Sequence, residues 1–142
     1  MSLIQLNNLA KEYKSGNEKV IAVNNISLEI HQGEFVSLMG ESGSGKSTLL
    51  TMLGGLNKPT NGNIVIDEID IYNLSPNRLA DFRREYIGFV FQSFQLIPYL
   101  TVIENVQLPL ATNGHSKKVQ AELASSILNK VHLESKGKRL IN

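Results

Sequence analysis

The sequence predicts an α/β fold, and three features of its 142 residues support that class. Near the N-terminus, apolar and polar residues alternate as they do in half-buried strands. Phe35–Met39 is a short apolar run of the kind that forms a strand buried on both faces, and a glycine-rich loop follows it directly. From Ser116 onward, apolar residues instead recur at the spacing of a helix. We therefore expect strands and a glycine-rich loop first, and helices at the end.

The predicted strands are short. Ile4 and Leu6 alternate with polar residues and indicate a first strand, and a second strand region runs over residues 20–30. Residues 14–17 read Lys-Ser-Gly-Asn, which is typical of a turn. The isoleucines of residues 64–71 indicate one strand or a tight strand pair. Residues 87–91 form a further apolar run, which predicts a buried strand ending at Gln92.

Two helices are predicted in the middle of the chain. The first begins at Lys46 and ends at the pair Gly54-Gly55, because glycine is a common helix terminator. Its apolar face consists of Leu49, Leu50, Met52 and Leu53. The second begins at Ser75-Pro76, where serine caps the helix and proline takes the first helical position, and it continues through Arg84.

Two more helices are predicted in the last third of the chain. Thr101 and Glu104 have the spacing of a capping box, and Pro109 limits the helix that they begin. A final helix follows Ser116. Its apolar stripe consists of Val119, Leu123, Ile127 and Val131.

Composition excludes several classes of function. The apolar fraction of 42% and the charged fraction of 19% are those of a soluble globular protein. A net charge of +1 gives no electrostatic argument for binding nucleic acid or an anionic membrane. The absence of cysteine removes disulfides, thiolate catalysis and cysteine-based zinc sites. We expect no signal peptide, because residues 1–5 carry neither a basic region nor a long apolar stretch, and no apolar run is long enough to cross a membrane.

The strongest motif is the glycine-rich loop. Residues 40–47 read G-E-S-G-S-G-K-S, which matches the phosphate-binding pattern G-x-x-x-x-G-K-[ST] of P-loop NTPases. The glycines allow backbone N–H groups to turn inward around phosphate oxygens, and the following helix adds its positive dipole end. Lys46 is expected to reach the β- and γ-phosphates, and the hydroxyl of Ser47 to bind Mg²⁺. A chance match occurs in roughly one chain of this size in a few hundred, but the apolar run before the loop and the helix after it favour a functional site.

The loop and its flanks also resemble a family. Residues 40–50 (G-E-S-G-S-G-K-S-T-L-L) and 54–62 (G-G-L-N-K-P-T-N-G) are similar to the ATP-binding subunits of ABC transporters. Residues 87–110 look like the Q-loop region of the same family. Their sequence is most similar to that of the subfamily serving lipoprotein-release and macrolide-export transporters. The resemblance covers the whole chain in order. It implies a P-loop NTPase fold with an incomplete RecA-like core, an antiparallel β subdomain and the start of a helical subdomain.

That resemblance implies roles for individual residues. The nucleotide would lie on Gly40, Glu41, Ser42, Gly43, Ser44, Gly45, Lys46, Ser47 and Thr48, with Tyr13 stacked on the adenine ring. Gln92 would touch Mg²⁺ or the attacking water, so that Lys46 and Gln92 are the expected catalytic residues and Ser47 and Gln92 the expected metal contacts. The alternatives are an ordinary aromatic at the end of a strand for Tyr13 and a polar strand end for Gln92.

The implied domain organisation places the β subdomain and P-loop core in residues 1–92. The Q-loop and part of the helical subdomain then occupy residues 93–142. The apolar segment after Gln92 consists of Phe94, Leu96, Ile97, Pro98, Tyr99 and Leu100. We expect part of it in the core of the helical subdomain and part exposed to a transmembrane subunit.

Three elements of the family are not found in these 142 residues: an L-S-G-G-Q signature, an apolar strand ending in Asp-Glu, and a switch histidine. Residues 64–68 read I-V-I-D-E and imitate the second of these. They come too soon after the P-loop and before the Q-loop, so we interpret Asp67-Glu68 as the turn of a strand pair, where family members often have glycine. His31, His115 and His132 fit surface or capping roles.

The resemblance implies a complete protein that works as a homodimer on transmembrane permease subunits, cytoplasmic and peripheral on the inner face of the cell membrane. It would hydrolyse ATP with Mg²⁺, whereas residues 1–142 alone would at most bind nucleotide, without turning it over. Because the two apolar strands are not neighbours in the family's core, we expect this polypeptide alone to be unstable, to aggregate or to pair with another chain. The alternative is a non-hydrolysing nucleotide-binding or regulatory module. A soluble ATPase of DNA repair or translation is disfavoured, because the chain has no basic surface.

Overall fold

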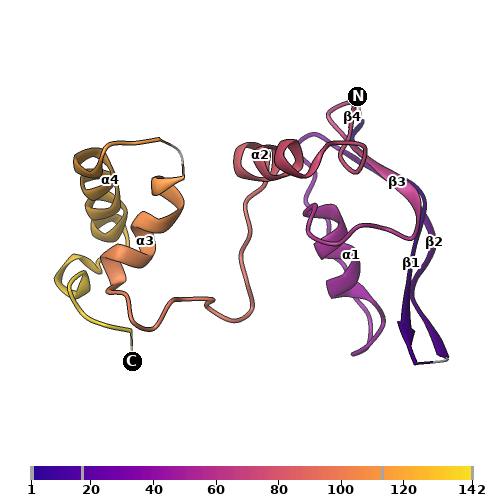
Figure 1. The fold of residues 1–142 in the computed structure, drawn as a ribbon, viewed down its shortest axis with the longest axis horizontal. Helices are drawn as coiled ribbons and strands as arrows, with labels where there is room; N and C mark the ends of the chain where they lie inside the picture. Colours follow the sequence, from indigo (N-terminus) through magenta and orange to yellow (C-terminus); the bar gives the residue numbers. More distant parts are fainter. Residues whose placement is uncertain (1, 17, 113, 142) are drawn as a thin grey trace. The chain divides into compact units, whose positions relative to one another are not determined.

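The computed structural model describes residues 2–16, 18–112 and 114–141. Its chain forms two compact units, the first ending at Val90 and the second beginning at Phe91. The first unit contains the strands and two helices, and the second contains two α-helices and a short 3₁₀ helix (Figure 1). Each unit is described by itself.

A four-stranded antiparallel sheet organises the first unit. β1 (Ser2–Ser15) and β2 (Glu18–His31) form a long hairpin, in which Leu6 pairs with Leu28 and Tyr13 with Val20. β3 (Asn61–Ile66) pairs with the other edge of β1, and β4 (Ile69–Asp70) completes the order β2-β1-β3-β4. The predicted N-terminal strands and the predicted strand pair over residues 64–71 are confirmed. Of the predicted turn over residues 14–17, Asn17 lies outside the described residues.

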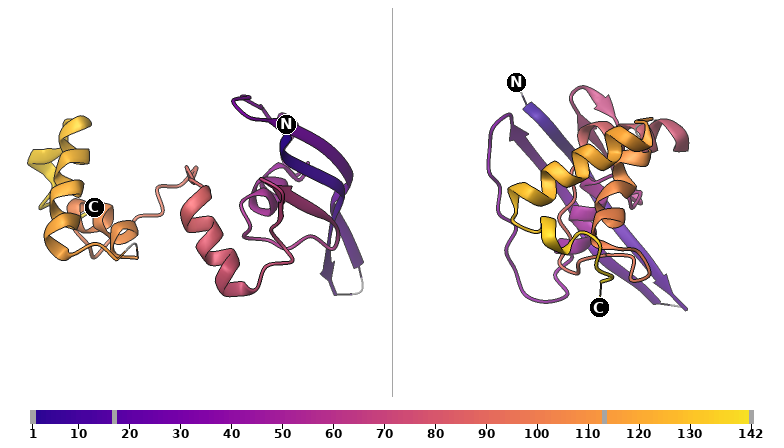
Figure 2. Two further views of the ribbon diagram at one scale, coloured as in Figure 1. Left: turned by 90° about the horizontal axis from the view of Figure 1, so that it is seen from above. Right: turned by 90° about the vertical axis from the view of Figure 1, so that its left-hand side faces the viewer.

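Helix α1 (Lys46–Leu53) packs on one side of this sheet (Figure 2). Its predicted start at Lys46 and its end at Gly54 are confirmed. Leu49 and Met52 are buried and belong to one apolar cluster. The cluster also contains side chains from β1, β2 and β3, one residue directly after β4, and one from the helix that follows. A fully buried side chain of this size contributes about 1.5–3 kcal/mol. The other buried members are Leu6, Leu9, Val23, Ile64, Ile71 and Phe82.

Helix α2 (Pro76–Tyr86) begins as predicted. The Ser75 hydroxyl accepts a hydrogen bond from the Arg78 N–H at 3.5 Å, and Pro76 takes the first helical position. The helix contributes Phe82 to the core, and the Phe82 ring stacks on Tyr86 with 5.0 Å between centroids.

Two predicted strands are wrong. Residues 35–39 and 87–91 have no regular secondary structure, and their side chains are largely exposed, with Phe35 at 97% and Val90 at 101% of full exposure. A strand exists only through hydrogen bonds to a neighbouring strand, and neither segment belongs to the sheet that the structure describes. The apolar composition therefore indicated two segments suited to burial. It did not show whether neighbouring strands are present to pair with them.

The second unit is a helical hairpin with a C-terminal return. α3 (Val102–Ala111) packs against α4 (Lys117–Lys130), and the 3₁₀ helix η1 (Glu134–Lys136) follows. The predicted capping box at Thr101 is confirmed, and so is the helix predicted after Ser116, which Ser116 caps. Pro109 lies within α3 rather than at its end. Asn105 of α3 holds the irregular segment that precedes this helix. Its side chain accepts a hydrogen bond from the Ile97 N–H at 2.8 Å and donates to the Ile97 and Thr101 carbonyls at 3.1 and 3.0 Å.

The predicted apolar stripe of α4 is not the buried face. Ala124 and Leu128 are the buried residues of this helix, whereas Val119, Leu123, Ile127 and Val131 are each more than a third exposed. The helix therefore packs through a face one residue further along than the pattern indicated. None of the helices in the described part of the chain is both long and apolar enough to span a bilayer.

Candidate functional site

The glycine-rich loop joins the irregular segment after β2 to the N-terminus of α1. Gly40 and Gly45 both have positive φ angles, of 155° and 88°. A Cβ atom on Gly45 would lie 2.0 Å from the carbonyl oxygen of Ala22 in β2, and one on Gly40 would lie 2.8 Å from the Ser44 hydroxyl. Glycine is therefore required here both for backbone conformation and for the close approach of the loop to the sheet.

Lys46, the first residue of α1, places its ammonium group within the loop. Its ammonium group donates to the carbonyl oxygens of Gly40 at 2.8 Å and Glu41 at 2.5 Å, and to the Ser44 hydroxyl at 3.2 Å. The loop also closes on itself, since the Ser44 N–H donates to the Glu41 carbonyl at 3.3 Å. A cation held at the N-terminus of a helix creates a position suited to phosphate oxygens, because the helix dipole and the charge have the same sign.

A hollow of about 330 Å³ lies between the loop and β2. The loop contributes Gly40, Ser44, Gly45 and Lys46 to its lining, and β2 contributes Ile21, Ala22, Val23, Asn24 and Ile26. Ser42, Gly43 and Ser47 are exposed, and Thr48 is half-buried on the first turn of α1. The backbone of the loop and a cation thus face a space bounded by a sheet, which fits a nucleotide's phosphates.

Tyr13 lies in the same unit, one strand away from the hollow. It pairs with Val20, and the preceding residue, Glu12, pairs with Ile21 of the hollow's wall. The Tyr13 side chain is 41% exposed and its hydroxyl accepts a hydrogen bond from the Asn57 amide at 2.6 Å. The Lys11 ammonium lies over the ring, 5.2 Å from its centroid. The ring is therefore both accessible and held.

Gln92 is the second residue of the second unit and lies in an irregular segment. The structure accordingly describes this residue separately from the phosphate loop. The apolar residues after Gln92 differ in exposure, which the sequence alone did not predict. Phe94 and Tyr99 are largely exposed, whereas Ile97 and Leu100 are half-buried where the segment contacts the start of α3.

Asp67 and Glu68 form the two-residue turn between β3 and β4. Both have positive φ angles, of 48° and 64°, and the Asp67 N–H donates to the Leu3 carbonyl at 2.9 Å. This backbone conformation is the one that favours glycine in tight hairpins, and here Asp67 and Glu68 adopt it. The apolar residues before it belong to the antiparallel sheet, as predicted from their place in the sequence.

Sequence reasoning missed the residues that hold Tyr13. Asn57 and Lys11 contact it directly, and Tyr72 fixes the loop that carries Asn57. The Tyr72 hydroxyl lies 2.7 Å from the Met52 carbonyl and 2.8 Å from the Asn57 carbonyl, and burial raises the pKa of its phenol to about 12. No periodicity marks these residues. The only available signal was the position of Asn57 within the family-like stretch 54–62.

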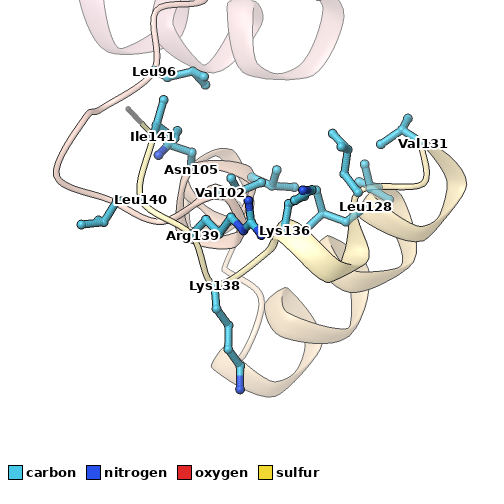
Figure 3. A pocket seen from close by; sticks show the side chains of 13 residues that line it. Leu96, Val102, Asn105, Leu128, Val131, Lys136, Lys138, Arg139, Leu140 and Ile141 are labelled. Carbon is cyan, nitrogen blue, oxygen red and sulfur yellow. The ribbon is translucent and has the colours of Figure 1, made fainter.

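The second unit has a separate groove of about 1020 Å³ (Figure 3). Leu128 of α4 and Val131, directly after that helix, line one part of the groove. Val102 and Asn105 of α3 line another, and Leu140 and Ile141 of the C-terminal segment line a third. Lys136, Lys138 and Arg139 stand among these largely apolar side chains. Among the residues that the structure describes, no three histidine, aspartate or glutamate side chains form a cluster that could hold a metal ion.

Comparison with known proteins identifies the family. A model of a family described as ABC transporter matches residues 23–142. The chain belongs to the ABC transporter family. Its relatives include an uncharacterized ABC transporter ATP-binding protein of Bacillus subtilis, YvrO, which is 45% identical over 134 residues. The macrolide export ATP-binding/permease protein MacB of Salmonella typhi is 41% identical over 135 residues.

Solved structures of the ABC transporter cassette MJ0796 are also similar. The ABC transporter ATP-binding protein MJ0796 of Methanocaldococcus jannaschii is 54% identical over 125 residues. Its dimeric structure bound to ADP and Pi superposes with a TM-score of 0.87 over 96% of this chain, at 44% identity. The predicted α/β P-loop NTPase fold, present here as part of a cassette, is therefore confirmed. The present chain spans only part of the length of these relatives: 58% of YvrO, 53% of MJ0796 and 21% of MacB.

Proposed function

We propose that the complete protein is the ATP-binding subunit of an ABC transporter and that it couples ATP binding and hydrolysis to transport by membrane subunits. The observation that carries the proposal is the loop around Lys46. The loop brings a cation, a glycine-rich backbone and the N-terminus of α1 to one side of a hollow of about 330 Å³. That combination is what a triphosphate requires.

Each loop residue has a proposed task. Gly40, Glu41, Ser42, Gly43, Ser44 and Gly45 wrap their backbone around the β-phosphate, and Lys46 gives up its contacts to carbonyl oxygens for the β- and γ-phosphates. These carbonyl contacts are neutral acceptors, so exchanging them for anionic oxygens strengthens the hydrogen bonds of the ammonium. Ser47 and Thr48 complete the site on the first turn of α1, where their hydroxyls and N–H groups are closest to the positive end of the helix.

The proposed metal is Mg²⁺, which neutralises phosphate charge when bound. Ser47 is its proposed ligand from the loop and Gln92 its proposed contact from the Q-loop. Mg²⁺ in nucleotide sites takes few protein ligands and keeps water and phosphate oxygens, so one hydroxyl and one amide fit this mode. The roles of Lys46 and Gln92 in catalysis are to stabilise charge on the γ-phosphate and to orient the water.

The proposed partners are transmembrane permease subunits and a second copy of the ATPase, with no role for nucleic acid. This assigns the protein to the inner face of the cell membrane, held there through the permease. The support is the family together with two relatives: MacB joins an ATP-binding part and a permease in one protein, and MJ0796 is dimeric. The exposed Phe94 and Tyr99 of the segment after Gln92 are available for such contacts.

A charge-removing variant tests the nucleotide site in the complete protein. Lys46→Ala should abolish measurable binding of Mg-ATP by calorimetry, because no second cation stands among the loop residues that line the hollow. Lys118→Ala on α4 is the matched control and should bind ATP as the parent does, since Lys118 lies in the other unit and is exposed. Unchanged affinity in Lys46→Ala would refute the proposed site.

The second candidate is a nucleotide-binding or regulatory module without hydrolysis. Within residues 1–142, the L-S-G-G-Q sequence is not found, and the Asp-Glu pair that follows an apolar strand lies in the hairpin turn at Asp67-Glu68. Steady-state phosphate release separates the two. The polypeptide of residues 1–142 should bind without turnover, and the complete protein should hydrolyse. Activity in residues 1–142 that disappears on Glu68→Gln would overturn the assignment of that segment as a simple turn.

A further inference from the structure

Tyr13 is held at two points by one loop. The loop runs from Gly54, after α1, to Thr60, before β3. The Asn57 side chain donates to the Tyr13 hydroxyl at 2.6 Å. The Lys11 ammonium, which lies over the Tyr13 ring, donates to the Lys58 carbonyl at 2.6 Å. Neighbouring residues of the loop therefore fix the edge of the ring and the cation above one of its faces.

The main chain of this loop is anchored independently of the Asn57 side chain. The Asn57 N–H donates to the Thr51 carbonyl at 3.2 Å, and the Asn57 carbonyl accepts from the Tyr72 hydroxyl at 2.8 Å. Further along, the Thr60 N–H donates to the Ala10 carbonyl at 2.8 Å. The amide of Asn57 thus has a rigid base, and its hydrogen bond to Tyr13 is not needed to place the loop.

We propose that Asn57 is a positioning residue for nucleotide binding: it orients the Tyr13 ring so that the face opposite Lys11 receives the base of the nucleotide. This inference rests on the proposed function, in which Tyr13 stacks on the base. An exposed aromatic ring on a strand end has two torsions free to rotate, and stacking requires that both be fixed. The amide fixes the hydroxyl end of the ring, and the Lys11 ammonium, within the usual ~6 Å of a cation–π contact, closes the face away from the base.

Asn57 and Lys11, which hold the Tyr13 ring, form a clamp on it. Helix α1 connects this clamp to the phosphate site. Its N-terminus carries Lys46 and Ser47, and the loop that begins directly after its C-terminus carries Asn57. The Tyr72 hydroxyl bridges the Met52 carbonyl of α1 and the Asn57 carbonyl, which holds the clamp to the helix. Lys46 of the phosphate loop and Asn57, which holds the Tyr13 ring of β1, therefore lie at opposite ends of the same helix.

The test compares ATP with inorganic tripolyphosphate, which has the charge-bearing groups but no base. Affinities of both ligands with Mg²⁺ are measured by calorimetry on the complete protein. Asn57→Leu removes the donor at similar volume, and Asn57→Asp keeps a link, because the Tyr13 hydroxyl can donate to the new carboxylate. Both are measured in the parent and in a Tyr13→Phe background, which gives a double-mutant cycle.

We expect Asn57→Leu to weaken ATP binding by roughly threefold to tenfold, the value of one hydrogen bond, and to leave tripolyphosphate binding unchanged. Asn57→Asp should bind ATP within about twofold of the parent. In the Tyr13→Phe background, Asn57→Leu should have no further effect. An equal loss for both ligands, an unchanged ATP affinity, or an undiminished effect in the Tyr13→Phe background would each overturn the positioning role.

One further variant separates this inference from the proposed function. Tyr13→Ala should lower ATP affinity and spare tripolyphosphate; an unchanged ratio would show that Tyr13 is no base platform and would overturn the inference while leaving the phosphate site in place. A complete protein that binds neither ligand would refute the proposed function and the inference with it.

Discussion

Thr101 and Glu104 cap α3 reciprocally. The Thr101 hydroxyl accepts from the Glu104 N–H at 3.4 Å, and the Glu104 carboxylate accepts from the Thr101 N–H at 2.8 Å and from its hydroxyl at 2.6 Å. These hydrogen bonds lower the pKa of Glu104 below 4.5, with the side-chain bond to Thr101 as the largest cause. The charged carboxylate also lies at the positive end of the helix dipole.

The cap should make the second unit sensitive to acid. Because the pKa of Glu104 is lower in the folded state than in the unfolded state, its contribution to stability is complete above pH ~4.5 and is lost as the pH falls through the lowered value. Thermal unfolding followed by circular dichroism between pH 6 and pH 3 should show this loss. Glu104→Gln keeps an acceptor for the cap but cannot titrate, so its melting temperature should change less over the same range. Equal pH dependence in both proteins would contradict the assignment.

Tyr72 should give the opposite dependence at the alkaline end. Its hydroxyl binds the Met52 and Asn57 carbonyls, and burial raises its pKa from 10.0 to about 12. The neutral phenol is the stabilised form, so the stabilisation is present below pH ~10 and is lost as the pH rises from ~10 to ~12. Tyr72→Phe should lower the free energy of unfolding by about 1 kcal/mol at pH 7 and should remove this alkaline dependence. A parent protein whose stability is flat between pH 9 and 11.5 would contradict it.

The local elements were predictable because their signals are local. The hydroxyl of Ser75, the pair Thr101 and Glu104, and the glycines after Leu53 act within one turn of their own helix, and each is confirmed. The strand predictions for residues 35–39 and 87–91 failed because a strand depends on a neighbour that sequence pattern does not specify. The clamp on Tyr13 was not foreseen for a related reason, since Asn57 lies 44 residues from its partner.

The loop glycines should differ in the cost of a side chain. Gly43 and Gly45 have similar positive φ angles, of 82° and 88°, but a Cβ on Gly43 meets no atom within 4 Å, whereas one on Gly45 collides with the Ala22 carbonyl. Gly43→Ala should therefore cost only the backbone strain, about 1–2 kcal/mol. Gly45→Ala should cost more and should also displace the loop from β2. Urea unfolding and ATP affinity of both variants in the complete protein check this, and equal effects would contradict the steric argument.

The polypeptide of residues 1–142 should associate with itself when produced alone. Phe35, Met39, Val90 and Phe94 expose more than four-fifths of their surface, and they lie in segments without regular structure. Exposed apolar segments that lack a strand neighbour favour aggregation through strand pairing. Sedimentation at several concentrations should show species larger than a monomer. Phe35→Ser and Val90→Ser together should reduce them, whereas Val119→Ser, on an exposed helical site, should not. A monodisperse monomer that unfolds cooperatively would show that these segments find cover within the chain itself.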